Sequence, residues 1–104
     1  MTAKMSVPET AAAGEIVPVK VLISHPMETG FRRGFDGSVY PRNIIHQIAC
    51  HYDGNEVFRA DLHPAISANP FFAFHLRATV SGDVTLVWTD EEGEHRESRP
   101  LTIT

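Results

Sequence analysis

Polar and apolar side chains alternate along much of this 104-residue sequence, with the period of two that is typical of half-buried β-strands. The first clear example is residues 16–24, IVPVKVLIS, where the β-branched side chains from Val17 to Ile23 fall on one face. Pro18 cannot donate a backbone hydrogen bond, so we expect an edge position or a bulge at that point of the strand.

Turn signals divide the rest of the chain into five further segments of the same kind. Asp53-Gly54 is a strong signal for a two-residue hairpin, and an acidic turn ending at Gly93 separates the last two segments. Six strands spaced by roughly 8–12 residues, without a helical period after residue 14, predict an all-β, immunoglobulin-like antiparallel β-sandwich. The five later strands are expected at residues 44–52, 56–62, 71–79, 84–89 and near 95–104.

The N-terminal segment has a different composition. Proline, threonine, alanine and glycine dominate residues 1–14, and only Met5 and Val7 offer bulky apolar side chains. We therefore expect a flexible leader over residues 1–14, followed by one domain over residues 15–104. No apolar h-region is readable at this end, so we expect no signal peptide.

Charge and cysteine content exclude several classes of protein. The formal net charge is −4 and the largest cationic cluster is the pair Arg32-Arg33, which argues against nucleic-acid binding. No apolar run approaches the ~20 residues that a membrane-spanning helix needs. Cys50 is the single cysteine, which excludes an internal disulfide. Its neighbour His51 points to the opposite face of the predicted strand, which favours a buried, inert thiol over a nucleophile.

Residues 25–30, HPMETG, follow the first strand and leave three alternatives open: a metal site, a contact surface, or only a loop. His25 and Met27 are possible soft-metal ligands, and His46 shares a strand face with Cys50. A metal site needs three or four converging ligands, whereas six scattered histidines are more typical of surface and turn positions. We therefore expect no metal and no other cofactor.

The alternative function is that of a mononuclear iron redox protein of the superoxide-reductase type. That immunoglobulin-like family has a His-Pro-Met stretch that resembles His25-Pro26-Met27, and it implies an iron held by four histidines and one cysteine. Here the sequence continues with ETGFRRG where Glu-His-Tyr is expected, and a late Cys-x-x-His-Gly segment is absent. The ligand inventory therefore does not match.

The fourth predicted strand has apolar side chains on both faces. One face, from Phe72 to Leu76, is explained by a core. The other face begins with Phe71 and Ala73, where an antiparallel strand with one wet face should be polar. Leu22 of the first strand is likewise an apolar side chain on a face where polar residues are expected. Because contiguous exposed apolar side chains tend to mark interfaces, we expect a protein partner to cover these faces.

Three stretches together resemble the SoxZ family, the Z subunits of the sulfur-oxidation (thiosulfate-oxidising) SoxYZ carrier complex. They are VKVLISHPMETGFRRG at residues 19–34, IIHQIACHYDGNEVFRADLHPAISANPFFAFHLRA at residues 44–78, and GDVTLVWTDEEGEHR at residues 82–96. The resemblance covers almost the whole chain from residue 16 onward, and ISHPMETG is its most specific element.

The resemblance implies a non-catalytic subunit with an immunoglobulin-like sandwich and no cofactor. It implies a tight heterodimer with SoxY, which carries the sulfur intermediates of thiosulfate oxidation on the cysteine of a Gly-Gly-Cys-Gly-Gly tail. This chain ends in LTIT, so we do not expect it to be the sulfur-bearing subunit. The resemblance also implies a periplasmic location, reached by export with the signal-bearing SoxY, and transient contacts with other Sox enzymes.

Within this interpretation, partner contacts are expected from two places. Pro26 and Gly30 would shape HPMETG as a recognition loop, and the cationic pair after it would attract anionic groups or acidic partners. The apolar faces of the first and fourth strands would meet SoxY, and would permit homodimers when the chain is alone. The expected partner-binding residues are His25, Met27, Glu28, Arg32, Arg33, Phe71 and Phe72.

Overall fold

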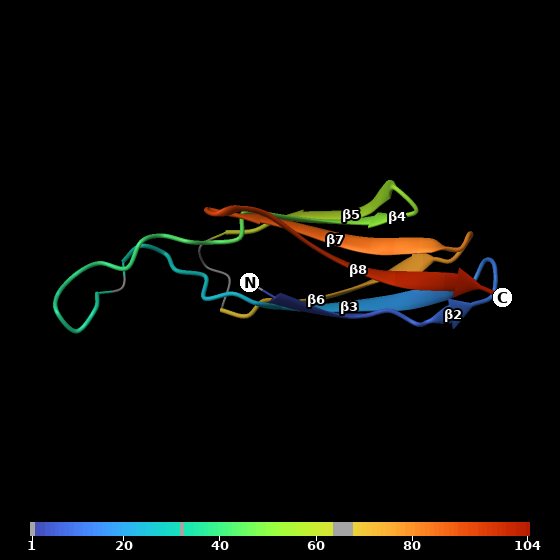
Figure 1. Ribbon diagram of the computed structural model, residues 1–104, viewed down its shortest axis with the longest axis horizontal. Coiled ribbons are helices and arrows are strands. Elements are labelled where there is room, and N and C mark those ends of the chain that lie inside the picture. The colour runs from blue at the N-terminus through green and yellow to red at the C-terminus, as the bar shows by residue number, and fades with distance from the viewer. Residues whose placement is uncertain (1, 32, 64–67) are drawn as a thin grey trace.

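The computed structural model describes residues 2–31, 33–63 and 68–104, and these residues form two facing β-sheets (Figure 1). One sheet has the order β1-β3-β6 and the other the order β2-β8-β7-β4-β5. All pairs are antiparallel except the short parallel pair β2–β8, which confirms the predicted sandwich. Within the described ranges, no helix is long and apolar enough to cross a membrane. The strands are β1 (Thr2–Ser6), β2 (Thr10–Ala11), β3 (Ile16–Ser24), β4 (Gln47–Tyr52), β5 (Asn55–Asp61), β6 (Phe71–Arg77), β7 (Gly82–Asp90) and β8 (Gly93–Ile103).

The core lies between the two sheets, where the alternating pattern places it. In β3 every second residue from Val17 to Ile23 is buried, and Trp88 of β7 is the largest fully buried side chain. Phe58 of β5 and Phe74 of β6 stack with their ring centroids 4.5 Å apart. This aromatic pair joins the edge strands of the two sheets, which closes one side of the sandwich.

Two local predictions about turns and edges are confirmed. Asp53 and Gly54 both have positive φ angles, of 50° and 81°, as the tight turn favoured by an Asp-Gly pair requires. The β1–β3 ladder stops at the pair Ser6 and Lys20, so β3 pairs only with β6 at Pro18. The missing N–H of Pro18 is therefore tolerated at a locally exposed edge.

The N-terminal segment differs from the expected leader. Thr2–Ser6 form β1, which pairs with β3 and buries Ala3 and Met5. Thr10–Ala11 form β2 beside the end of β8. Such short strands are not detectable as hydrophobic runs, because backbone partners supplied by β3 and β8 stabilise them.

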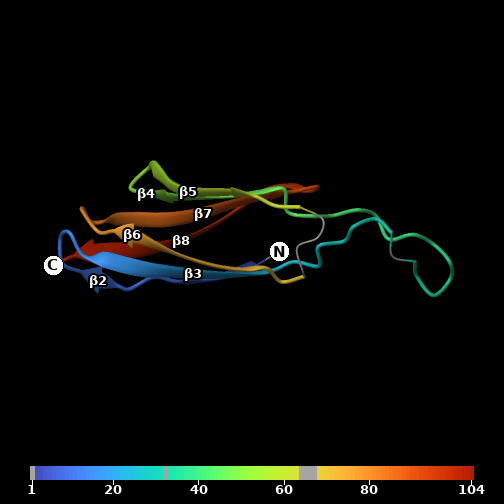
Figure 2. The same ribbon diagram turned by 180° about the vertical axis from the view of Figure 1, so that it is seen from behind.

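The chain between β3 and β4 leaves the sandwich at one end and projects beyond the sheets (Figures 1 and 2). The molecule consequently measures 57 × 18 × 18 Å along its principal axes. Two isolated bridges cross this segment, Glu28 with Asn43 and Arg33 with Val39. We call residues 29–42 the arm, leaving aside Arg32, which lies outside the described residues.

Candidate partner-binding site

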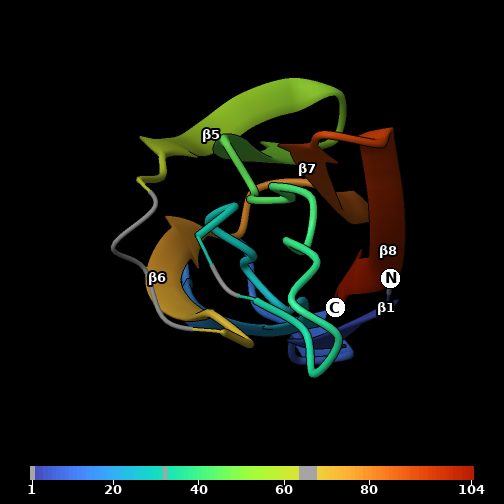
Figure 3. The same ribbon diagram turned by 90° about the vertical axis from the view of Figure 1, so that its left-hand side faces the viewer.

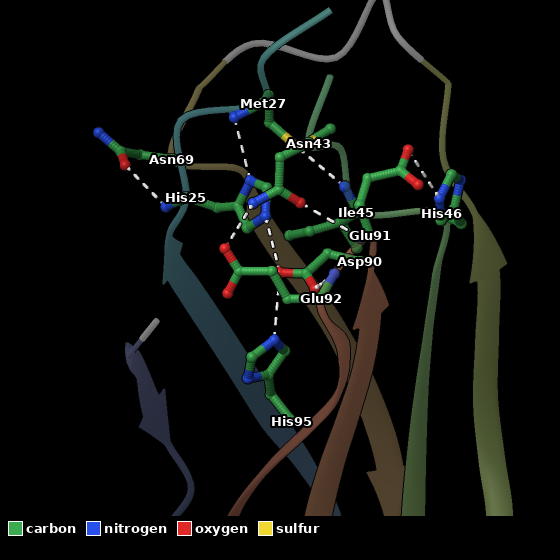
Figure 4. A network of polar contacts seen from close by, with 10 residues as sticks. All are labelled: His25, Met27, Asn43, Ile45, His46, Asn69, Asp90, Glu91, Glu92 and His95. Carbon is green, nitrogen blue, oxygen red and sulfur yellow. Dashed lines mark hydrogen bonds and ion pairs between the residues drawn. The ribbon is translucent and has the colours of Figure 1, made fainter. Parts of the chain in front are cut away.

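His25, the first residue after β3, lies in the interior and is 1% exposed (Figure 4). Its Nδ1 accepts a hydrogen bond from the backbone N–H of Met27 at 3.0 Å. The ring proton must then lie on Nε2, which donates to Oδ2 of Asp90 at 3.0 Å. The neutral imidazole thus joins the start of the HPMETG loop to the end of β7.

Asp90 is the centre of this network. Its carboxylate also accepts hydrogen bonds from Nε2 of His95 at 3.1 Å and from the backbone N–H of Glu92 at 2.8 Å. Burial opposes the ionised form of Asp90, but these two hydrogen bonds and the one from His25 outweigh burial and hold its pKa below its ordinary value. Asp90 is therefore a buried, ionised anchor whose oxygens are satisfied by donors from two segments.

Met27 completes the anchor of the HPMETG loop. It has a φ of 51°, which is uncommon for a non-glycine residue, and it is buried. Its Sδ accepts a hydrogen bond from the backbone N–H of Ile45 at 3.3 Å. The structure therefore corrects the expectation that His25 and Met27 contact a partner: both side chains point into the protein. Their own partners, Asp90 and Ile45, lie 65 and 18 residues away in the chain, beyond the reach of a local pattern.

Glu28 and Asn43 close the base of the arm. Their backbones exchange two hydrogen bonds of 2.8 Å. The side-chain oxygen of Asn43 accepts the N–H of Glu91, and the Glu91 carboxylate lies 3.0 Å from Nε of Arg42 and 3.2 Å from Nε2 of His46. The base is thereby fixed to the turn between β7 and β8 (Figure 4).

The arm itself turns aromatic side chains toward solvent. Phe31 is 86% and Phe35 is 111% exposed. Arg33, an expected contact residue, is also exposed, and its guanidinium donates to a backbone oxygen of the arm. Its expected companion Arg32 lies outside the described residues. The alternation of polar and apolar residues does not select these phenylalanines, although aromatic residues in a polar, glycine-containing stretch are an available signal.

A second exposed apolar region lies on the outer surface of the three-stranded sheet. Leu22 and Phe71 are direct cross-strand partners, and they are 39% and 60% exposed. A shallow hollow of about 270 Å³ lies beside them. Phe72, also an expected contact, instead faces inward opposite Val21 and packs against the core, because neighbouring strand residues point to opposite sides.

We call the exposed residues of this surface the outer face. They are Thr2, Lys4, Ser6, Ile16, Pro18, Lys20, Leu22, Ser24, Phe71, Ala73, His75 and Arg77. Both lysines of the chain belong to this set, and no carboxylate does, although the net charge is −4. The other sheet differs, since it has exposed charges that pair with each other, as in Glu94 and Arg96 at 2.9 Å. Positive charge beside apolar surface suits a partner that presents carboxylates.

Cys50 and the histidines do not gather into a metal-binding group in the described part of the chain. Cys50 is fully buried in β4, and burial raises the pKa of its thiol to about 11, which agrees with an inert thiol. His46, which we expected on the same strand face as Cys50, contacts Glu91 instead. The described residues contain no group of three or more His, Cys, Asp or Glu side chains that could hold a metal ion.

Comparison with solved structures identifies the fold. The sulfur carrier protein SoxY from Chlorobium limicola f thiosulfatophilum is similar with a TM-score of 0.71 and 21% identity, over 98% of this chain and 78% of that chain. The superoxide reductase (neelaredoxin) from Ignicoccus hospitalis has a TM-score of 0.74 and 18% identity, over 100% of this chain and 81% of that chain. A putative superoxide reductase from Thermotoga maritima has a TM-score of 0.74 and 18% identity, over 98% and 85%. At such identities the likeness concerns the fold alone.

A comparison with curated protein sequences finds no match. The family model of the sulphur oxidation protein SoxZ, in contrast, matches residues 5–100. The matched region contains the HPMETG loop, the arm, the buried network around Asp90 and most of the outer face. The chain therefore belongs to the SoxZ family of sulphur oxidation proteins.

Proposed function

We propose that this chain is a non-catalytic subunit of the SoxYZ carrier complex that binds and stabilises SoxY. The cysteine in the Gly-Gly-Cys-Gly-Gly tail of SoxY carries the sulfur intermediates of thiosulfate oxidation, and this chain helps to present it to the other Sox enzymes. The complex works in the periplasm, where the chain arrives together with its signal-bearing partner. The observation that carries the proposal is a cationic, partly apolar outer face in a member of the SoxZ family.

The chemistry of the described side chains supports binding rather than catalysis. The thiol of Cys50 is buried and its pKa is raised to about 11, so a thiolate nucleophile is not available near neutral pH. His25 is enclosed in the interior, and both of its ring nitrogens are engaged in hydrogen bonds that hold the loop. This histidine therefore serves the structure rather than a reaction.

The composition of the outer face supports an interface with SoxY. Leu22 and Phe71 form a small apolar centre, and Lys4 and Lys20 flank it. An apolar centre with a polar, solvent-accessible rim is the usual arrangement of a protein interface. Of the contacts expected from sequence, Phe71 thus remains a direct contact in this proposal, while His25 and Met27 act through the shape of the loop.

Homodimer formation, which the sequence analysis also expected for the isolated chain, is opposed by charge on this face. A twofold contact would place the same surface patch of both copies together. Lys4, Lys20 and Arg77 of one copy would then approach those of the other, with no carboxylate on the outer face to compensate. A partner of different sequence avoids this repulsion.

The lysine distribution gives a direct test. An amine-acetylating reagent can modify only Lys4, Lys20 and the terminal amine of this chain, since no other lysine occurs. We expect purified SoxY from the same organism to protect both lysines, as read by mass spectrometry. An unrelated acidic protein serves as the control. If SoxY co-purifies but leaves both lysines fully reactive, the outer face is not the interface. If SoxY does not bind at all, the proposed function is wrong.

A further inference from the structure

The two phenylalanines of the arm do not pack against the core that the described residues form. Phe35 is 111% exposed and Phe31 is 86% exposed, and neither belongs to the core or to the partly buried side chains packed against it. Water-exposed aromatic rings are unfavourable, and rings grouped on one projection are typical of binding anchors. The arm therefore presents exposed apolar side chains that are suited to contact another molecule.

The arm is preorganised rather than a free loop. Near the tip, the N–H of Gly34 donates to the carbonyl of Ser38 at 2.6 Å, and Asp36 accepts from both the N–H and the hydroxyl of Ser38. At the base, Glu28 and Asn43 exchange two backbone hydrogen bonds, and the buried network around Asp90 holds the preceding loop. Such bracing lowers the entropy lost when the phenylalanines are immobilised by a partner.

The arm is continuous with the outer face. Leu22 and Phe71 lie near the end of β3 that leads, through Ser24 and His25, into the arm. Seen end-on, the tip of the arm bends toward the side of the three-stranded sheet (Figure 3), and the two side views agree with this direction. A protein seated on the outer face at this end would therefore also meet the arm.

We propose that the arm is the second half of the SoxY-binding surface and clasps SoxY, with Phe31 and Phe35 entering an apolar depression of that subunit. This inference rests on the proposed function. A stable interface needs about 800 Å² from each partner, and the exposed apolar centre of the outer face consists of only a few side chains, including Leu22 and Phe71. The arm supplies further area and two exposed aromatic side chains.

The charges of the outer face and the arm favour SoxY, rather than a second copy of this chain, as the protein that binds there. The outer face has the cations Lys4 and Lys20 and no carboxylate. On the arm, the exposed cation Arg33 is accompanied by Asp36, whose carboxylate is engaged by Ser38. A twofold dimer that used this combined surface would bring all these cations together, whereas a different chain can present carboxylates to them.

The test compares the affinity of purified SoxY for the wild-type chain and for the double variant Phe31→Ser/Phe35→Ser, by isothermal titration calorimetry. Both rings are exposed, so the variant should retain the wild-type circular dichroism spectrum and melting temperature. We expect its dissociation constant to rise by about 100-fold. The matched control is Val57→Ser, which changes an exposed apolar side chain on β5 of the other sheet, and its affinity should match the wild type.

Equal affinities of the double variant and the wild type would overturn the role of the arm and leave the proposed function standing. A wild-type chain that does not bind SoxY would overturn the proposed function itself. Vesicles of phosphatidylglycerol provide one further outcome. If they bind the wild type but not the double variant, while SoxY affinity is unchanged, the phenylalanines serve a lipid surface and the inference is wrong.

Discussion

The Nε2 atom of His25 lies 3.0 Å from Oδ2 of Asp90, and neither side chain is exposed to solvent. This contact joins the end of β3 in one sheet to the end of β7 in the other, across 65 residues of sequence. Only the short stretch Pro26–Glu28 separates His25 from the arm. The buried pair therefore determines where the HPMETG loop leaves the sandwich and, through it, where the arm is held.

We expect Asp90→Asn to lower the free energy of unfolding by about 2 kcal/mol. The two carboxylate oxygens accept from His25, His95 and the N–H of Glu92, whereas an amide has one oxygen and one NH2 group. In either orientation the amide NH2 then faces another donor, either the ring N–H of His25 or the backbone N–H of Glu92. Urea unfolding at pH 7 measures the loss. The exposed carboxylate Asp61 provides the control Asp61→Asn, which should change stability by less than about 0.5 kcal/mol. Equal effects of the two variants would contradict the anchoring role.

Acidic pH should remove the additional free energy of unfolding that Asp90 provides relative to asparagine. The pKa of Asp90 is lower in the folded protein than its ordinary value, because its hydrogen bonds favour the ionised form despite burial. The stabilisation is therefore complete above about pH 4 and is lost as pH falls through the lowered folded pKa. We expect the difference in unfolding free energy between wild type and Asp90→Asn to be constant from about pH 5 to 7 and to shrink below about pH 4. A difference that grows on acidification would show that Asp90 is not held in its ionised form.

Met27→Leu should destabilise the protein by about 1 kcal/mol although it preserves size and hydrophobicity. The sulfur of Met27 accepts the N–H of Ile45, and leucine would leave that buried donor unpaired. Met5→Leu is the matched control, since Met5 is a buried methionine of β1. Thermal unfolding of both variants measures the difference. If both variants melted at the same temperature, the sulfur would contribute packing alone.

Cys50 should resist thiol reagents in the native protein. Burial excludes reagents and raises the pKa of the thiol to about 11, so both access and thiolate population are low near pH 8. We expect no reaction with a disulfide-exchange reagent until denaturant is added. A Ser98→Cys substitution in a Cys50→Ala background places a thiol on the exposed side of β8 and should react at once. Native Cys50 reacting as fast as this control thiol would contradict its placement in the core.

Local sequence determined most of the sandwich because strand faces follow a period of two. The burial of alternate residues in β3, the Asp53-Gly54 turn, the burial of Cys50 and the exposure of Phe71 were all predicted from near neighbours in the chain. Each of these features depends on backbone geometry or residue type within a few positions.

Tertiary structure alone decided the features that need partners distant in sequence. β1 exists because β3 offers it a ladder, and His25 is an anchor rather than a surface contact because Asp90 lies beside it. The direction of the arm, and hence the exposure of Phe35, follows from hydrogen bonds and ion pairs to the β7–β8 turn. The sequence by itself thus determined which faces each strand could bury. Which polar groups met in the interior was decided by folding, because a buried donor or acceptor is stable only when a distant segment supplies its partner.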